Sequence, residues 1–173
     1  KIQEELIMKL IGKILVGFVL FIILVLVGAA IYIDLPVFET ADDFSNYINT
    51  YNNVSYGLDD NIREINSFNR DSLISKKINE LEVKGEEVIV SYFRYEDPFT
   101  ARSSIKQYQE LNKGNFRINT MEINIPFYGK YWIQTSQGIT NISWTKNKRV
   151  ILIRSASRSI AKTVENDIKS YIK

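Results

Sequence analysis

Apolar residues are concentrated near the start of the chain. Residues 14–33 form an uninterrupted run of twenty positions without a charge, Asn, Gln or Pro. At about 1.5 Å per residue, a helix of this length covers the roughly 30 Å hydrocarbon core of a bilayer. The pattern predicts an N-terminal helix over residues 1–33 whose transmembrane span is 14–33. A cleaved signal peptide is the alternative, but its apolar region is typically only about 7–15 residues long, so the pattern favours an anchor.

Charged residues on the two sides of this run predict its orientation. Lys9 and Lys13 precede the run. Asp34 follows it, and the next Lys or Arg is not reached until Arg63. Lys and Arg favour the cytoplasmic side, and Tyr32 stands at the other end, where amphipathic rings prefer the headgroup level. We therefore expect a single-pass membrane protein whose N-terminus is cytoplasmic and whose remaining chain is extracytoplasmic.

Residues 34–79 carry short helical signals separated by turn residues, which predicts a membrane-proximal helical connector. Thr40 and Asp43 have the spacing of a capping box, which opens a short helix. Asp59 is a candidate N-cap for a second helix. Apolar residues at helical spacing predict a third helix; these residues are Ile74, Ile78 and Leu81.

From about residue 80 the apolar period becomes that of strands, and residues 80–173 are predicted to form an extracytoplasmic α+β domain. One helix begins after Asp97 and Pro98, and another is capped by Ser157. The main strand segments are 88–95, 116–125, 130–136, 139–145 and 149–155. Short turns between consecutive strands imply an antiparallel sheet, here of about five strands, and we expect the helices to pack on one face of it.

Composition removes several kinds of chemistry. The 173 residues include no Cys and no His. Disulfides, thiolate nucleophiles, cysteine zinc sites and imidazole bases are therefore excluded, and we expect no metal and no cofactor. Ser103 and Lys106 have the Ser-x-x-Lys spacing of penicillin-binding proteins, but the partner motifs of that set are absent. The sequence therefore predicts a protein that is not an enzyme.

Charge is divided unevenly along the chain. Residues 34–98 hold 14 Asp or Glu and 6 Lys or Arg, whereas residues 99–173 hold 4 and 13. The densest basic group near aromatic residues is a candidate interaction patch formed by Lys146, Lys148, Arg149, Arg154, Arg158 and Lys162. Such a group can bind single-stranded nucleic acid or an anionic glycan. Little nucleic acid is present outside the membrane, and the domain as a whole is nearly neutral, so nucleic acid is an unfavoured partner. Solvation of an open sheet face accounts for the charges more simply.

Two Asn-x-Ser sequons mark candidate glycosylation sites at Asn53 and Asn141. Both positions are extracytoplasmic in the predicted topology, so a glycan is permitted at each. Asn141 falls within a predicted strand, whereas Asn53 falls in a turn region, which suits a glycan better.

Three functional hypotheses follow. The first is a non-enzymatic, membrane-anchored protein whose outer domain binds other membrane or surface proteins, or further copies of itself, as a subunit or accessory of an assembly. The second is a filament subunit, because an apolar N-terminal helix with Glu5 near its start, followed by an α/β head, resembles type IV pilins in layout. Lys9 and Lys13 depart from that pattern, since charges are costly in an apolar filament core. The third is an extracytoplasmic hydrolase that uses two carboxylates, as glycosidases do.

Overall fold

The computed structural model describes residues 11–25, 35–52, 54–56, 72–112, 120–125 and 129–172. The chain divides into two compact units, Lys1–Asp34 and Leu35–Lys173. Residues 35–52, which we expected in a separate connector, therefore belong to the same unit as the sheet.

The first unit contains a helix over residues 11–25, and every residue of that helix is exposed, including Lys13. In the described part of the chain, no helix combines the length and the apolar character needed to cross a membrane. The described helix covers the first twelve positions of the predicted span, and residues 26–33 lie outside the described residues. Three other residues that we used to predict the membrane topology also lie outside the described residues; they are Lys9, Tyr32 and Asp34.

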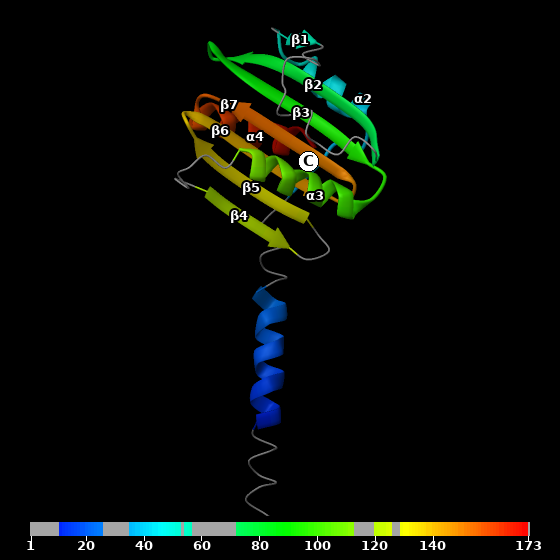
Figure 1. Ribbon diagram of the computed structural model, residues 1–173, viewed down its shortest axis with the longest axis vertical. Helices are drawn as coiled ribbons and strands as arrows, with labels where there is room; N and C mark the ends of the chain where they lie inside the picture. Colours follow the sequence, from blue (N-terminus) through cyan, green and yellow to red (C-terminus); the bar gives the residue numbers. More distant parts are fainter. Residues whose placement is uncertain are drawn as a thin grey trace, which may run out of the picture. The chain divides into compact units, whose positions relative to one another are not determined.

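The second unit is an α+β fold built on one antiparallel sheet (Figure 1). The strand order is β1-β2-β3-β7-β6-β5-β4, and every neighbouring pair is antiparallel. The elements in chain order are α2 (Ala41–Ile48), β1 (Val54–Tyr56), β2 (Leu73–Val83), β3 (Glu86–Tyr95), α3 (Pro98–Leu111), β4 (Thr120–Ile125), β5 (Gly129–Ser136), β6 (Ile139–Lys146), β7 (Arg149–Ser155) and α4 (Arg158–Ile172). The α+β class and the antiparallel sheet are confirmed, and the described residues form seven strands where about five were expected.

The predicted helix through Ile74, Ile78 and Leu81 is wrong, because these residues lie in β2. Ile78 belongs to the core beneath α3, and Leu81 is buried on the other face of the strand. A spacing of three residues suits one helix face, but in a strand it sends the two side chains to opposite faces. β2 pairs with β3 along its length, and the two are joined by a turn in which Lys84 and Gly85 both have positive φ. This pairing makes the segment a strand.

The expectation that the helices cover one face of the sheet is also wrong. Consecutive residues of β5 point to opposite faces, and each meets a different helix. Trp132 packs edge-on against Tyr108 of α3, with ring centroids 6.0 Å apart, whereas the Tyr131 hydroxyl reaches Glu165 of α4. Figure 1 shows α3 on the near face of the sheet and α4 on the far face. Two helical layers are needed because the central strand β7 is apolar and buried on both faces from Val150 to Ile153.

The segment before α2 packs on the α4 face. Thr40 and Asp43 form the predicted capping box, with the Thr40 hydroxyl accepting from the Asp43 amide at 3.0 Å. Phe38 lies against Phe44 of α2 and Tyr92 of β3, with ring centroids 5.3 and 6.5 Å apart. Aromatic packing of this kind joins residues 35–48 to the sheet, and so they do not form an independent connector.

Candidate functional site

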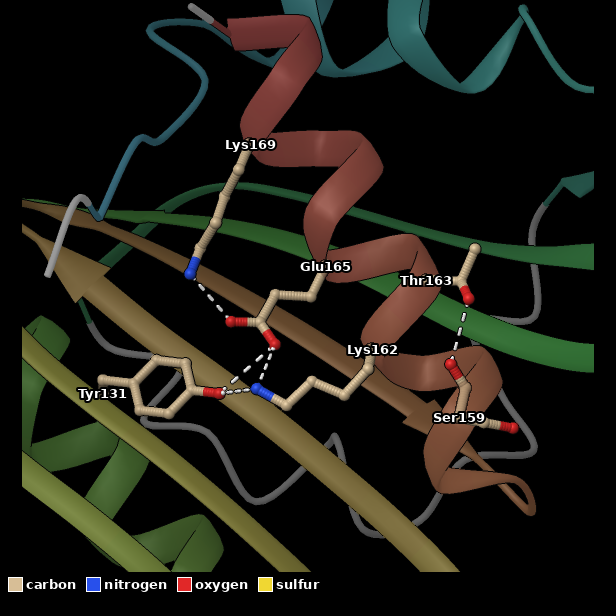
Figure 2. Close-up of polar contacts among 6 residues, drawn as sticks. All are labelled: Tyr131, Ser159, Lys162, Thr163, Glu165 and Lys169. Carbon is tan, nitrogen blue, oxygen red and sulfur yellow. Dashed lines mark hydrogen bonds and ion pairs between the residues drawn. The ribbon is translucent and has the colours of Figure 1, made fainter.

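Among the described residues, the most charged buried cluster lies between α4 and β5 (Figure 2). The Glu165 side chain is only 2% exposed and faces the sheet. One of its oxygens accepts hydrogen bonds from Lys162 Nζ at 2.7 Å and from the Tyr131 hydroxyl at 3.2 Å. The other accepts from Lys169 Nζ at 2.8 Å. Both ammonium groups also lie over the Tyr131 ring, at 5.3 and 5.4 Å from its centroid.

Glu165 forms ion pairs with both Lys162 and Lys169, so the cluster is an ionic network. Burial, and then the negative charge of Glu165, raise the pKa of Tyr131, so its hydroxyl keeps its proton to a higher pH than an ordinary tyrosine does. That hydroxyl also accepts a hydrogen bond from Lys162 at 2.7 Å. Neighbouring hydroxyls do not form a nucleophile and base pair, since Thr163 Oγ1 donates to the backbone carbonyl of Ser159 at 3.0 Å. The arrangement fixes α4 to the sheet and offers no activated nucleophile.

A second polar cluster lies on the α3 face beside the outer strand β4. Lys130 Nζ of β5 forms an ion pair with Glu122 of β4 at 2.9 Å and donates to Gln109 Oε1 at 2.9 Å. The Glu122 side chain is about half exposed, whereas Lys130 is largely covered. Lys130 therefore compensates the one charge that β4 carries.

The six residues of the predicted basic patch come from two parts of the fold. Three of its residues lie at the β6–β7 turn and three near the far end of β7 and on α4; these groups are Lys146, Lys148 and Arg149, and Arg154, Arg158 and Lys162. Arg149 forms an ion pair with the Glu39 carboxylate and donates to the Glu39 carbonyl oxygen at 3.1 Å. Lys162 is held by Glu165. Two of the six cations are thus engaged by carboxylates within the fold.

The candidate catalytic spacing on α3 has an ordinary helical explanation. Ser103 Oγ donates to the carbonyl oxygen of Thr100 at 3.0 Å, one turn earlier. Lys106 is exposed on the same helix. The bond of Ser103 is one that serine often makes inside helices, and it gives the hydroxyl no general base.

The two sequons have different outcomes. Asn141 is 3% exposed in β6, and its side-chain oxygen accepts a hydrogen bond from the Tyr108 hydroxyl at 2.9 Å. A glycan on Asn141 is incompatible with this buried position, and that candidate is wrong for the folded domain. Asn53 lies outside the described residues.

A cleft of about 460 Å³ lies where β1, β2 and β3 come together. Three carboxylates line it, together with Asn52, Val54, Leu81 and Gly85; these carboxylates are Glu80, Glu82 and Glu87. Glu82 and Glu87 are direct cross-strand partners, a pairing of like charges that weakens a sheet. Nowhere in the described residues do three or more Asp, Glu, His or Cys come together in a way that could hold a metal ion. The hydrolase hypothesis, which needs two carboxylates in distinct catalytic roles, remains a prediction.

Sequence reasoning missed the buried Glu165. Its signal was present, because Glu165 follows Val164 directly and falls within the apolar stripe of the last helix, between Ala161 and Ile168. A carboxylate at such a position predicts buried cationic partners, and Lys162 and Lys169 stand one turn away on either side.

Comparison with known proteins leaves the family open. No protein-family model matches the chain, and no curated protein matches it. Among solved structures, the chain is similar to a GTP binding regulator from Thermotoga maritima, with 12% sequence identity and a TM-score of 0.41. That match covers 69% of this chain and 71% of the other.

Proposed function

We propose that the protein is a non-enzymatic, single-pass membrane protein. Residues 14–33 span the bilayer with the N-terminus in the cytoplasm. The α+β unit is extracytoplasmic and binds other membrane or surface proteins as a subunit or accessory of an assembly.

The observation that carries this proposal is the character of the first helix. Its large apolar side chains are between 40% and 69% exposed; they are Ile11, Ile14, Leu15, Val16, Phe18, Val19, Leu20, Phe21, Ile22, Ile23, Leu24 and Val25. Apolar surface of this extent costs about 25 cal/mol per Å² in water, so such a helix requires lipid or protein around it. The sequence remains free of charge up to residue 33, which supplies the length for a lipid environment.

Two buried charged groups of the second unit support a role in the fold rather than in catalysis. The buried carboxylate of Glu165 and the covered ammonium of Lys130 are each engaged by partners within the fold. Catalytic acids, bases and nucleophiles are instead commonly found in clefts with an open approach for a substrate.

Orientation can be tested with single cysteines, because the natural chain has none. Gln3→Cys places a thiol before the span, and Ser170→Cys places one at an exposed position of α4. In intact cells, a membrane-impermeant maleimide should label Ser170→Cys and leave Gln3→Cys unlabelled until the cells are lysed. Recovery of both variants in the soluble fraction would refute the anchor, and the reverse labelling pattern would refute the orientation.

The binding role is tested separately by extraction in mild detergent, followed by size analysis and mass spectrometry of co-migrating proteins. A discrete complex of fixed composition supports the subunit role. A monomer under all gentle conditions contradicts it, and fibres in which the apolar helix is buried would favour the pilin-like alternative.

A further inference from the structure

Strand β4 forms one margin of the sheet. It is the last strand in the sheet order, and among the described residues its one strand partner is β5 (Figure 1). The margin at the other end is the three-residue strand β1, whereas β4 pairs continuously over six residues, from Thr120 opposite Gln134 to Ile125 opposite Gly129. An edge of this length presents a row of outward backbone N–H and C=O groups to another strand.

Three common protections of a sheet edge are missing within the described strand β4. Edge strands are commonly blunted by Lys, Pro or a bulge. The β4 sequence TMEINI contains no Lys or Pro, and its register with β5 has no irregularity. Its one charge, Glu122, is compensated within the molecule by Lys130. Met121, on the opposite face, keeps 46% of its surface exposed.

The β4 sequence is complementary to itself in one antiparallel register. When Ile123 lies opposite Ile123 of a second copy, Glu122 faces Asn124 and Met121 faces Ile125. Glu122 and Asn124 share one face of the sheet, and Asn124 is exposed, so its amide can donate to the carboxylate. The register shifted to place Glu122 opposite Glu122 would oppose like charges instead.

We propose that β4 pairs with β4 of a second copy about a two-fold axis at Ile123, which joins the two sheets into one continuous sheet. This inference rests on the protein-binding part of the proposed function and not on the membrane anchor. A two-fold interface of this kind closes on itself and limits assembly through β4 to a dimer. Backbone hydrogen bonds supply the attraction, and the Glu122–Asn124 pairs set the register.

The register can be read by disulfide trapping in the full chain, purified in mild detergent. Directly opposed residues in antiparallel strands have Cα atoms about 4.5–5.5 Å apart, within the range that a disulfide bridges. Ile123→Cys should therefore give at least about tenfold more oxidised dimer than Thr120→Cys, whose two copies stand about 20 Å apart in this register. Ser170→Cys on α4 is the control, which measures how much oxidised dimer forms by random collision.

A second pair of variants tests the edge without cysteine. Met121→Lys places the residue that commonly guards sheet edges on β4, and we expect it to raise the dissociation constant of the dimer at least about tenfold. Ile74→Lys, an equivalent change at a 53% exposed apolar residue of β2, should leave the dimer unchanged.

Each outcome decides the inference. Selective trapping at Ile123→Cys with loss of the dimer in Met121→Lys supports it. Equal trapping at all three cysteines, or a dimer that withstands Met121→Lys, overturns it and assigns self-association to another surface. A disulfide from Ile123→Cys to a different protein also overturns it, while leaving the proposed binding role intact. Failure of the anchor would appear separately, in the membrane fractionation above.

Discussion

The indole nitrogen of Trp144 donates a hydrogen bond to the carbonyl oxygen of Pro36 at 2.8 Å. Trp144 lies on β6, next to the central strand β7, and Pro36 is the second residue of the second unit. Both residues are buried. This bond joins the first residues of the unit to its core.

Replacing Trp144 with Phe keeps an aromatic ring but removes the donor. The buried carbonyl of Pro36 then loses its partner, and we expect the free energy of unfolding to fall by about 1–3 kcal/mol. Urea denaturation measures this loss. Limited proteolysis should also cut residues 35–40 faster than in Trp132→Phe, which makes the same change on the α3 face; equal cleavage rates would contradict the role of the bond.

The elements with the strongest local signals were predicted correctly. Asp97 caps α3 by accepting from the backbone amides of Phe99 and Thr100 at 2.8 and 2.9 Å, and Pro98 opens the helix. The uniformly apolar stretch from Val150 to Ile153 predicted a central strand, and β7 has three strands on each side. In such segments local propensity and tertiary packing agree, so the pattern alone suffices.

The incorrect predictions concern features that depend on contacts between segments far apart in the sequence. Ile78 and Leu81 suit a helix by spacing, and only the pairing partner β3 makes their segment a strand. The face that each helix covers depends on strand order, which the sequence does not encode locally. Asn141 matched a sequon by its neighbours, but its burial follows from α3, more than thirty residues away, through Tyr108.

The Glu165 network gives a direct test of ionic fixation. Glu165→Gln keeps the side-chain size but leaves Lys162 and Lys169 facing an uncharged group. We expect a loss of about 1–3 kcal/mol, below the value for fully buried pairs because both lysines are partly exposed to solvent. Glu86→Gln, at an exposed position beside the β2–β3 turn, should change stability by less than about 0.5 kcal/mol. Equal stability of the two variants would show that the network contributes nothing.

Alkaline pH should weaken the contact between α2 and α4. The Tyr47 hydroxyl lies 2.8 Å from that of Tyr51, and both hydroxyls donate to Asp167 of α4. Burial, and then the hydrogen bond to Asp167, raise the pKa of Tyr51 to about 12. An unfolded tyrosine ionises near pH 10, so above that pH the folded chain binds more protons and stability decreases as pH rises.

The contribution of Tyr51 is therefore complete below about pH 10 and lost as pH rises through about 12. Urea midpoints measured across this interval should fall less steeply in Tyr51→Phe than in the natural chain. Tyr171→Phe, which changes an exposed tyrosine on α4, serves as the control. The same slope in Tyr51→Phe and in the natural chain would refute the assignment.

Gly129 leaves room for the residues that enter the second unit. A Cβ atom at this position would lie 2.2 Å from the backbone oxygen of Thr145 and 3.1 Å from Leu35 Cδ1. The Thr145 oxygen belongs to the neighbouring strand β6 and cannot move without disturbing the sheet, so Gly129→Ala should destabilise the unit by about 3 kcal/mol.

Gly17→Ala is the matched control, because a Cβ there meets nothing within 4 Å and alanine favours helix. Urea denaturation followed by tryptophan fluorescence reports on the second unit, since Trp132 and Trp144 are both in its sheet. Retention of the natural midpoint in Gly129→Ala would mean that β5 and β6 can separate at this end without cost, and that the close approach of Leu35 does not depend on glycine.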